Sequence, residues 1–229
     1  MKNPICIGVT GASGAIYAIR LLEVLCASGR DVHLSISPSG ADVIRQELNL
    51  NIDLDDFRPE CLLLGDTASP AESRLPLLQP SAGTAAREND AARAAIGRPG
   101  RLSYYHWQDF MAPMASGSFL TSGMVICPCS GTTLSAVAAG AAGNLIQRAA
   151  EVHLKERRPL VLVPRETPLS LTHIDNMRRV TEAGAIVLPA SPGWYHGVTA
   201  IRDLVDFVVA RICDQLGVED ALTKRWGTE

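Results

Sequence analysis

The chain is short of aromatic residues, of long apolar runs and of net charge, and each shortage narrows what the protein can be. Aromatic residues make up 5% of its 229 residues, which favours helices packed closely on a sheet over an aromatic-rich sandwich. No apolar run approaches the length of about 18 residues that a membrane span needs, and glycines interrupt the apolar N-terminal stretch. The net charge of −3 gives no general attraction to nucleic acid or to an anionic membrane. We therefore expect a cytoplasmic protein without nucleic-acid or membrane partners.

Patterns that bind metals are also scarce. The six cysteines are scattered, mostly in apolar segments, and the pair Cys127 and Cys129 has no second Cys or His pair at zinc-ligand spacing. Buried free thiols are therefore favoured over disulfides or a metal site. The acidic run from Asp53 to Asp56 lacks the D-D-x-x-D pairs of metal-dependent prenyl diphosphate enzymes, which favours an exposed acidic loop. We expect no metal cofactor.

Strand and helix patterns alternate along the chain, which predicts an α/β fold: a Rossmann-like, doubly wound parallel sheet in a single domain. The Leu160–Val163 run is continuous in Leu and Val, as buried parallel strands are. Strands are expected at residues 4–10, 32–37, 124–127, 160–163 and 185–188. Helices are expected at residues 14–27, 41–48, from 133 onward, 145–157, 171–183 and 201–216.

The segment from about residue 62 to residue 103 does not fit this alternation. It is rich in Pro, Gly, Ala, Ser and Arg and has little periodicity. A structureless stretch of this length is uncommon inside a compact domain unless it is an insertion. We interpret residues 1–229 as one domain that carries a peripheral surface insertion at about 62–103.

Ligands of doubly wound sheets bind at the carboxyl ends of the strands, so the loops that follow the strands are the places to inspect. Two of these loops consist of small residues before a helix: V-T-G-A-S-G-A at 9–15 and P-C-S-G-T-T at 128–133. Free N–H groups at a helix start attract phosphate. Each loop by itself could be a plain turn, with Ser130 or Thr132 capping the helix. Together, and without an acidic ribose ligand about 20 residues past the glycines, they favour a mononucleotide over a dinucleotide.

A third signal follows the strand at 160–163. Arg165 and Glu166 come directly after it, between Pro164 and Pro168. A charged side chain at the end of a buried strand costs free energy unless it is paired or takes part in binding or catalysis. We therefore favour a functional role for this pair over simple salt bridging.

These motifs resemble the UbiX-type flavin prenyltransferases. G-A-S-G-A-I-Y, P-C-S, L-K-E-R-R-P-L-V-L, R-E-T-P-L and W-Y-H occur in that order, and the resemblance covers residues 3–60 and 109–229. It implies that the protein transfers a dimethylallyl group from dimethylallyl monophosphate to reduced flavin mononucleotide (FMN), at N5 and C6. The prenylated flavin would then serve a UbiD-type decarboxylase. The resemblance also implies a homo-oligomer, possibly a dodecamer.

The resemblance further assigns roles to residues of this chain. Glu166 and Ser13 would be catalytic, with Glu166 assisting proton transfer, and Trp226 would close over the site. The flavin nucleotide would contact Gly11, Ala12, Ser13, Ser37, Ser130, Gly131, Thr132, Thr133 and Arg165. The prenyl phosphate would be held by Arg148, Lys155, Tyr195 and Arg211.

Two other functions stay open at this point. A flavin-dependent decarboxylase of cysteine-containing substrates shares the expected fold, but its P-A-S-A-N-T loop is replaced here by P-C-S-G-T-T. A non-catalytic FMN-binding partner subunit is disfavoured because Glu166, Lys155, Tyr195 and Arg211 are all present.

Overall fold

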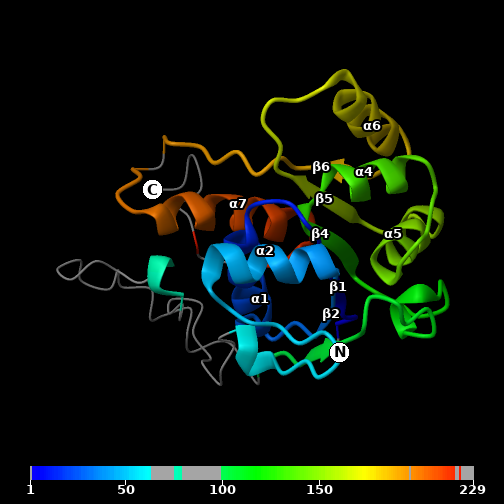
Figure 1. Cartoon of the computed structure of the whole chain (residues 1–229), viewed down its shortest axis with the longest axis horizontal. Coiled ribbons are helices and arrows are strands. Elements are labelled where there is room, and N and C mark those ends of the chain that lie inside the picture. Colours follow the sequence, from blue (N-terminus) through cyan, green and yellow to red (C-terminus); the bar gives the residue numbers. More distant parts are fainter. Residues whose placement is uncertain (1, 63–74, 79–98, 196, 220–221, 223–229) are drawn as a thin grey trace.

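The computed structural model describes residues 2–62, 75–78, 99–195, 197–219 and 222 (Figure 1). Strands and helices alternate along these parts of the chain, as the sequence predicts. The strands are β1 (Ile5–Val9), β2 (Val32–Ile36), β3 (Leu102–Tyr104), β4 (Gly123–Cys129), β5 (Leu160–Pro164) and β6 (Ile186–Val187). The α-helices are α1 (Ala15–Ala27), α2 (Pro38–Leu48), α4 (Gly131–Ala138), α5 (Leu145–Lys155), α6 (Leu171–Glu182) and α7 (Ile201–Gln215). Short 3₁₀ turns are η1 (Pro59–Leu62), η2 (Pro76–Leu78) and η3 (Pro113–Ala115).

The six strands form one sheet in the order β3-β2-β1-β4-β5-β6. Every neighbouring pair is parallel. The order reverses between β1 and β4, because the chain moves outward from β1 to β3 and then in the other direction from β4 to β6. This is the doubly wound arrangement that the sequence predicts, and its reversal point is where such sheets bind ligands.

Helices cover both faces of the sheet because each strand alternates its side chains between two apolar cores. Ile5, Ile7 and Val9 of β1 belong to the core that contains α1 and α7. Cys6, between them, belongs to the core that contains α4, α5 and α6. Figure 1 shows α4, α5 and α6 grouped together, with α1 and α2 on the other side of the strands. Both faces are therefore buried, as in other all-parallel sheets.

A buried ion pair joins α1 to α7. Arg20 is fully buried, and its Nε atom donates to Asp206 Oδ1 at 2.6 Å. Glu23 and Arg202 extend the network, with contacts of 3.1 Å to Arg20 and to Asp206. Burial by itself lowers the pKa of Arg20, but the carboxylates of Asp206 and Glu23 outweigh it and raise the pKa above its usual value.

Described parts of the segment at about 62–103 contribute to the fold, although the sequence predicts a peripheral position for it. Leu102–Tyr104 forms β3, which pairs with β2 in the register Val32 to Leu102. Leu75 and Leu78 are buried in the core beside α1 and α7. The apolar side chains of this segment pack in the core, although the rest of its composition is typical of turns. Residues 63–74 and 79–98 lie outside the described residues.

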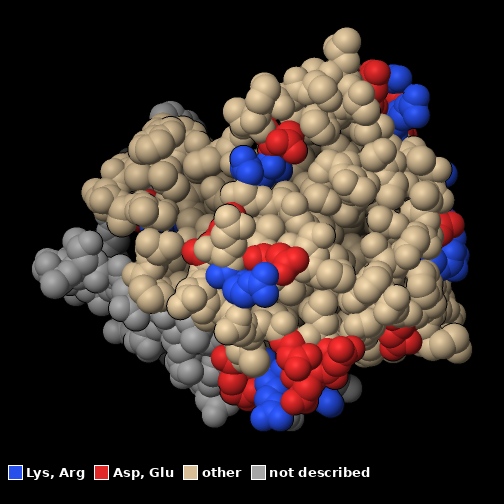
Figure 2. All heavy atoms as spheres, viewed as in Figure 1, with Lys and Arg blue, Asp and Glu red and all other residues tan. Residues whose placement is uncertain are grey.

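On one face of the molecule, the charged side chains stand in separate groups. On the face shown in Figure 2, charged side chains stand in small groups separated by broad uncharged areas. Within the described parts of the chain, no helix combines the length and the apolar character needed to cross a membrane.

Candidate functional site

The loops that follow β1 and β4 meet at the reversal point of the sheet. Thr10, which is buried, joins them: its hydroxyl donates to the Pro128 carbonyl at 2.8 Å and accepts from the Ser130 N–H at 2.8 Å. The sequence pattern did not single out Thr10, because a threonine at a strand end has no signature of its own. The two small-residue loops therefore form one structural unit, as their position in the sequence predicts.

Two glycines shape the first loop for different reasons. Gly14 has a φ angle of 115°, which L side chains rarely adopt. Gly11 lies so close to α2 that an added Cβ would stand 2.4 Å from the Cβ of Ser39. The conformation of this loop is thus set by backbone geometry and by packing against α2, independently of any ligand.

Glu47 of α2 occupies the start of α1 and was missed by the sequence analysis. Its carboxylate accepts from the Gly14 N–H at 3.0 Å and from the Ala15 N–H at 2.8 Å. The N-cap residue of α1 is Gly14, which has no side chain to cap the helix, and the first turn of α1 contains no acidic residue. An anionic acceptor at this position satisfies N–H groups and complements the helix dipole. That unfilled cap was the signal that could have led to Glu47.

Serines cap the two helices that follow β2 and β4. Ser37 accepts from the Gly40 N–H at 3.0 Å at the start of α2. Ser130 accepts from the Thr133 N–H at 3.2 Å at the start of α4, and its hydroxyl donates to the Thr133 hydroxyl at 3.0 Å. The capping reading of Ser130 is therefore correct, and its place beside the first loop leaves a binding role open as well.

The end of β5 reaches the same place. Arg165 Nε donates to the Ser13 carbonyl at 3.4 Å, which links this strand end to the first loop. Glu166 is exposed and lines a pocket of about 760 Å³ with Gly11, Gly131 and Thr132. Other residues of α4, and Thr172, His173 and Asn176 of α6, also line this pocket. The structure thus brings Glu166 to the small-residue loops, as the sequence analysis expected.

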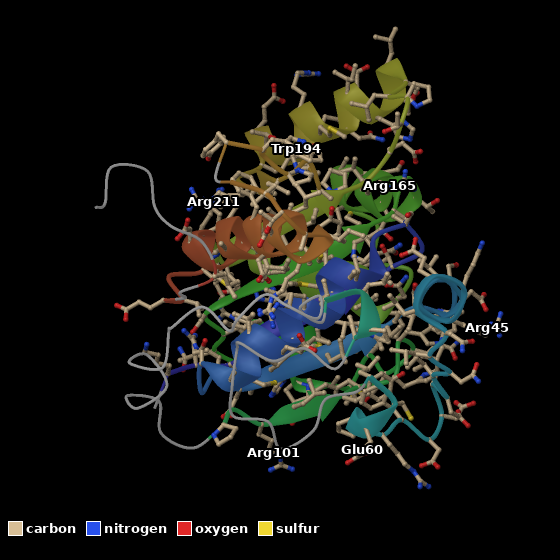
Figure 3. The ribbon with its side chains drawn as sticks, turned by 90° about the vertical axis from the view of Figure 1, so that its left-hand side faces the viewer. Arg45, Glu60, Arg101, Arg165, Trp194 and Arg211 are labelled. Carbon is tan, nitrogen blue, oxygen red and sulfur yellow. The ribbon has the colours of Figure 1, made fainter. Side chains whose placement is uncertain are left out.

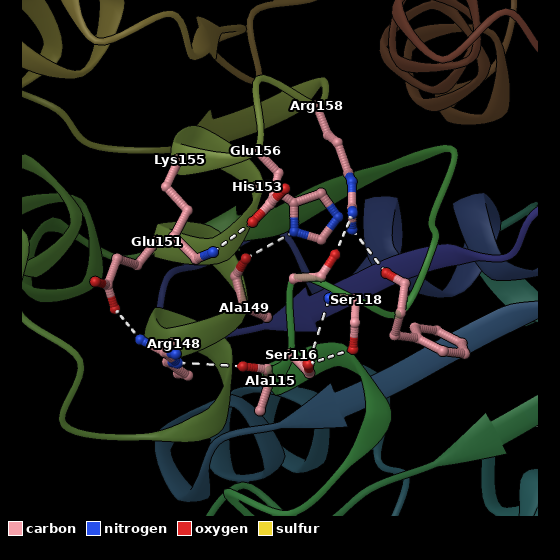
Figure 4. A network of polar contacts seen from close by, with 12 residues as sticks. Ala115, Ser116, Ser118, Arg148, Ala149, Glu151, His153, Lys155, Glu156 and Arg158 are labelled. Atoms are coloured by element: carbon pink, nitrogen blue, oxygen red, sulfur yellow. Dashed lines mark hydrogen bonds and ion pairs between the residues drawn. The ribbon is translucent and has the colours of Figure 1, made fainter.

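The four residues expected to hold the prenyl phosphate are not brought together within one chain. Arg148 and Lys155 lie on α5 (Figure 4). Arg148 donates to Glu151 at 2.8 Å and to the Ala115 carbonyl at 3.2 Å, and Lys155 pairs with Glu156. Helix α5 packs on the face of the sheet opposite to α7.

Tyr195 and Arg211 belong to the other face. Arg211 is on α7 and pairs with Asp214. The ring of Tyr195 meets the ring of Phe207, also on α7, edge to face with centroids 5.8 Å apart. Figure 3 shows Arg211 well separated from Arg165. Trp226 lies outside the described residues.

The two buried cysteines of β4, Cys127 and Cys129, are unreactive. Burial raises the pKa of Cys129 to about 12, and the pKa of Cys127 is raised further for the same reason. Such thiols stay protonated and are poor nucleophiles. Among the described residues, no group of three or more His, Cys, Asp or Glu side chains is placed to hold a metal ion.

Comparison with known proteins adds the chemical class. A family model described as Flavoprotein matches residues 1–213. The flavin prenyltransferase UbiX of Pseudomonas aeruginosa is 45% identical over 231 residues, which cover 100% of this chain and 97% of that protein. The chain belongs to the UbiX-type flavin prenyltransferases of the flavoprotein family. The resemblance and the enzyme class predicted from the sequence are thereby confirmed, and decarboxylation of cysteine-containing substrates is not favoured.

Two solved structures support the same relationship. The crystal structure of AnUbiX (PadA1) in complex with FMN and dimethylallyl pyrophosphate has a TM-score of 0.75 and 32% identity, and each chain is covered completely. A dodecameric FMN-dependent UbiX-like decarboxylase from Escherichia coli O157:H7 has a TM-score of 0.73 and 32% identity, again with 100% of both chains covered. Both structures confirm the predicted Rossmann-like fold, and they support FMN as the predicted flavin.

Proposed function

We propose that this protein joins a dimethylallyl group from dimethylallyl monophosphate to N5 and C6 of reduced FMN, in the pocket at the ends of β1, β4 and β5. The observation that carries the proposal is the convergence of Gly11, the Ser130–Thr132 loop and the Glu166 carboxylate on one pocket of about 760 Å³. A similar protein of known structure holds FMN and dimethylallyl pyrophosphate. Reduced FMN supplies the nucleophilic ring atoms, and the prenyl phosphate supplies the electrophilic carbon.

The two loops suit a nucleotide because their small residues let the ligand approach the backbone. Gly131 and Thr132 begin α4, where N–H groups and the helix dipole favour an anion. Arg165 adds a positive charge beside Ser13, and it holds the Ser13 carbonyl. We assign flavin contacts to Gly11, Ala12, Ser13, Ser37, Ser130, Gly131, Thr132, Thr133 and Arg165.

Glu166 is placed to move a proton in this pocket. Its side chain is exposed, and no ion pair joins it to Arg165 among the described residues. The carboxylate is therefore available to take a proton as the ring closes, and Ser13 on the first loop is assigned as the second catalytic residue. A positioned carboxylate contributes about 10²–10⁴-fold in rate.

The test of this role is the Glu166→Gln variant. We expect its FMN affinity and its melting temperature to stay near those of the wild-type protein, while single-turnover prenylation slows by about 100-fold or more. Glu182→Gln is the matched control, because Glu182 is exposed on α6 and pairs with Arg178 at 2.6 Å. Wild-type turnover in Glu166→Gln would refute the catalytic role. A joint loss of FMN affinity and melting temperature would make Glu166 a structural residue.

We also propose that the protein is a homo-oligomer and that the phosphate site needs more than one copy. Arg148 and Lys155 lie on one face of the sheet, whereas Tyr195 and Arg211 lie on the other. Large apolar side chains stand exposed, including Met111 (91%), Leu171 (80%) and Trp194 (69%). Exposed apolar groups of this size are typical of contact surfaces. A similar UbiX-like protein of known structure is described as dodecameric.

Mixing two inactive variants tests whether copies share the phosphate site. Lys155→Ala and Arg211→Ala are expected to be inactive when each is assayed alone. Mixed oligomers, formed by dissociating and reassociating the two variants together, should recover part of the activity because some sites combine an intact Lys155 with an intact Arg211. No recovery in mixtures whose mixed assembly is verified by native mass spectrometry would place the whole site in one chain.

The product is proposed to pass to a UbiD-type decarboxylase in the cytoplasm. The established class of the protein supports this step, since prenylated flavin has no reaction to perform in the transferase itself. Adding the reaction mixture to a cofactor-free decarboxylase of that type should restore decarboxylation. A decarboxylase that stays inactive, although prenylated FMN is detected by mass spectrometry, would contradict the assignment.

A further inference from the structure

One wall of the pocket that Glu166 lines is polar, and the proposed reaction uses none of the residues of this wall. This wall is formed by α6, from which Thr172, His173 and Asn176 line the pocket. Asn176 is 8% exposed, and its side chain makes no hydrogen bond within the described parts of the chain. Its amide atoms are not among the buried unpaired ones, so they are accessible to a ligand in the pocket. The α6 wall therefore has the character of a surface that receives a polar ligand.

The orientation of His173 can be worked out from its contacts. Its Nδ1 atom accepts from the Ser170 backbone N–H at 3.2 Å, and the Ser170 hydroxyl lies 3.1 Å from the same atom. A backbone N–H can only donate, so Nδ1 is an acceptor and carries no proton. The single proton of the neutral ring is then on Nε2. Ser170 is itself held in place as the N-cap of α6, where it accepts from the His173 N–H at 3.3 Å.

The Nε2 atom faces the pocket across Gly131. A Cβ added to Gly131 would stand 2.9 Å from Nε2 of His173 and 4.0 Å from Oε2 of Glu166. His173 and Glu166 thus flank one point that only a glycine leaves open. No hydrogen bond from Nε2 is found among the described residues. An oriented N–H donor and a carboxylate acceptor therefore stand beside the place where the proposed ligands bind.

We propose that His173 is a ligand-binding residue of this pocket and that Ser170 sets its tautomer. Nε2–H donates a hydrogen bond to an oxygen of the bound ligand, which belongs either to the flavin nucleotide or to the phosphate of the prenyl donor. Glu166 lies on the other side of that oxygen. This inference rests on the proposed function for the identity of the ligands, but its donor geometry comes from α6 and Gly131 alone.

Three variants test the donor. His173→Leu removes it, His173→Gln keeps an N–H donor on a side chain, and Asp175→Asn changes an exposed residue of α6 that does not line the pocket. Loss of one hydrogen bond to a ligand weakens binding by about tenfold. We expect that loss in His173→Leu, a smaller loss in His173→Gln and none in Asp175→Asn. FMN affinity is measured by fluorescence titration, and KM is measured for dimethylallyl monophosphate.

The two measurements identify the oxygen. A weaker FMN affinity in His173→Leu assigns it to the flavin nucleotide, and a raised KM for dimethylallyl monophosphate with unchanged FMN affinity assigns it to the prenyl phosphate. Unchanged values of both in His173→Leu would overturn the inference while leaving the proposed function intact. Absence of FMN binding by the wild-type protein would instead overturn the proposed function, and this inference with it.

A measurement on the wild-type protein covers the case in which His173→Leu does not fold. Imidazole ¹⁵N NMR gives a readout that does not depend on activity. We expect the Nε2–H tautomer in the wild-type protein, and a proton on Nδ1 of the neutral ring would overturn the inference.

Discussion

The buried ion pair between α1 and α7 predicts a large loss of stability when one partner is removed. In Asp206→Asn, Arg20 keeps its full burial and its contact with Glu23 but loses the carboxylate that lies 2.6 Å from Nε. Breaking a buried ion pair costs about 3–5 kcal/mol. Since Glu23 remains, we expect the lower end, about 3 kcal/mol. Arg202→Gln removes a less buried partner of Asp206 and should cost about 1 kcal/mol or less.

Urea unfolding at neutral pH measures these differences, with the protein concentration held constant because assembly contributes to apparent stability. The double variant Arg20→Met with Asp206→Leu is the decisive comparison. Replacing both by apolar side chains removes the fully buried charge of Arg20, whereas Glu23 and Arg202 each lose one contact at the edge of the network. The double variant should therefore be more stable than Asp206→Asn alone, in which Arg20 stays charged and buried. A loss below about 1 kcal/mol in Asp206→Asn, or a double variant as unstable as the sum of two single losses, would refute this reasoning.

Two further predictions concern stability. Burial lowers the pKa of His153 from 6.5 to about 4, so the unfolded chain binds this proton more readily than the folded protein does. The contribution of His153 to the free energy of unfolding is then fully present above pH 6.5, and about 3 kcal/mol of it is lost as the pH drops to 4. The variant His153→Gln should flatten this pH dependence, which urea unfolding at pH 5 and pH 7 measures. Leu78 is fully buried, so Leu78→Ala should cost about 2–5 kcal/mol. We propose that the rest of the 62–103 segment is a surface insertion, so deletion of residues 80–97 should cost less than Leu78→Ala, and an equal loss would contradict that.

The sequence predicted the sheet and its binding edge because both follow from local patterns. The runs at 5–9 and 160–164 contain no charged residue and are rich in Ile, Val and Leu, and parallel strands bring their carboxyl ends to one edge. β3 was missed because it has only three residues and follows Pro99 and Gly100 after a single Arg101. Such a short run has no periodicity to detect, and it becomes a strand only because β2 offers a free edge.

The residues that were missed in the site depend on contacts between elements. Glu47 lies on an ordinary amphipathic helix, and its contact with Gly14 spans 33 residues of sequence. His173 was passed over because a histidine in the first turn of a helix reads as part of a cap, which it also is. Neither role is visible until α2 and α6 are placed against their neighbours.

The four residues expected to hold the prenyl phosphate show why the resemblance alone could not describe the whole site. It assigned Arg148, Lys155, Tyr195 and Arg211 to one ligand, but their spacing does not say on which face of the sheet each helix packs. Helix α5 leads from β4 to β5 on one face, whereas α7, after β6, packs against α1 on the other. A phosphate held by all four side chains must therefore touch more than one copy of the chain. In that case assembly explains two observations. Contacts between copies cover the exposed apolar side chains, and they bring the cations of the two faces to one phosphate.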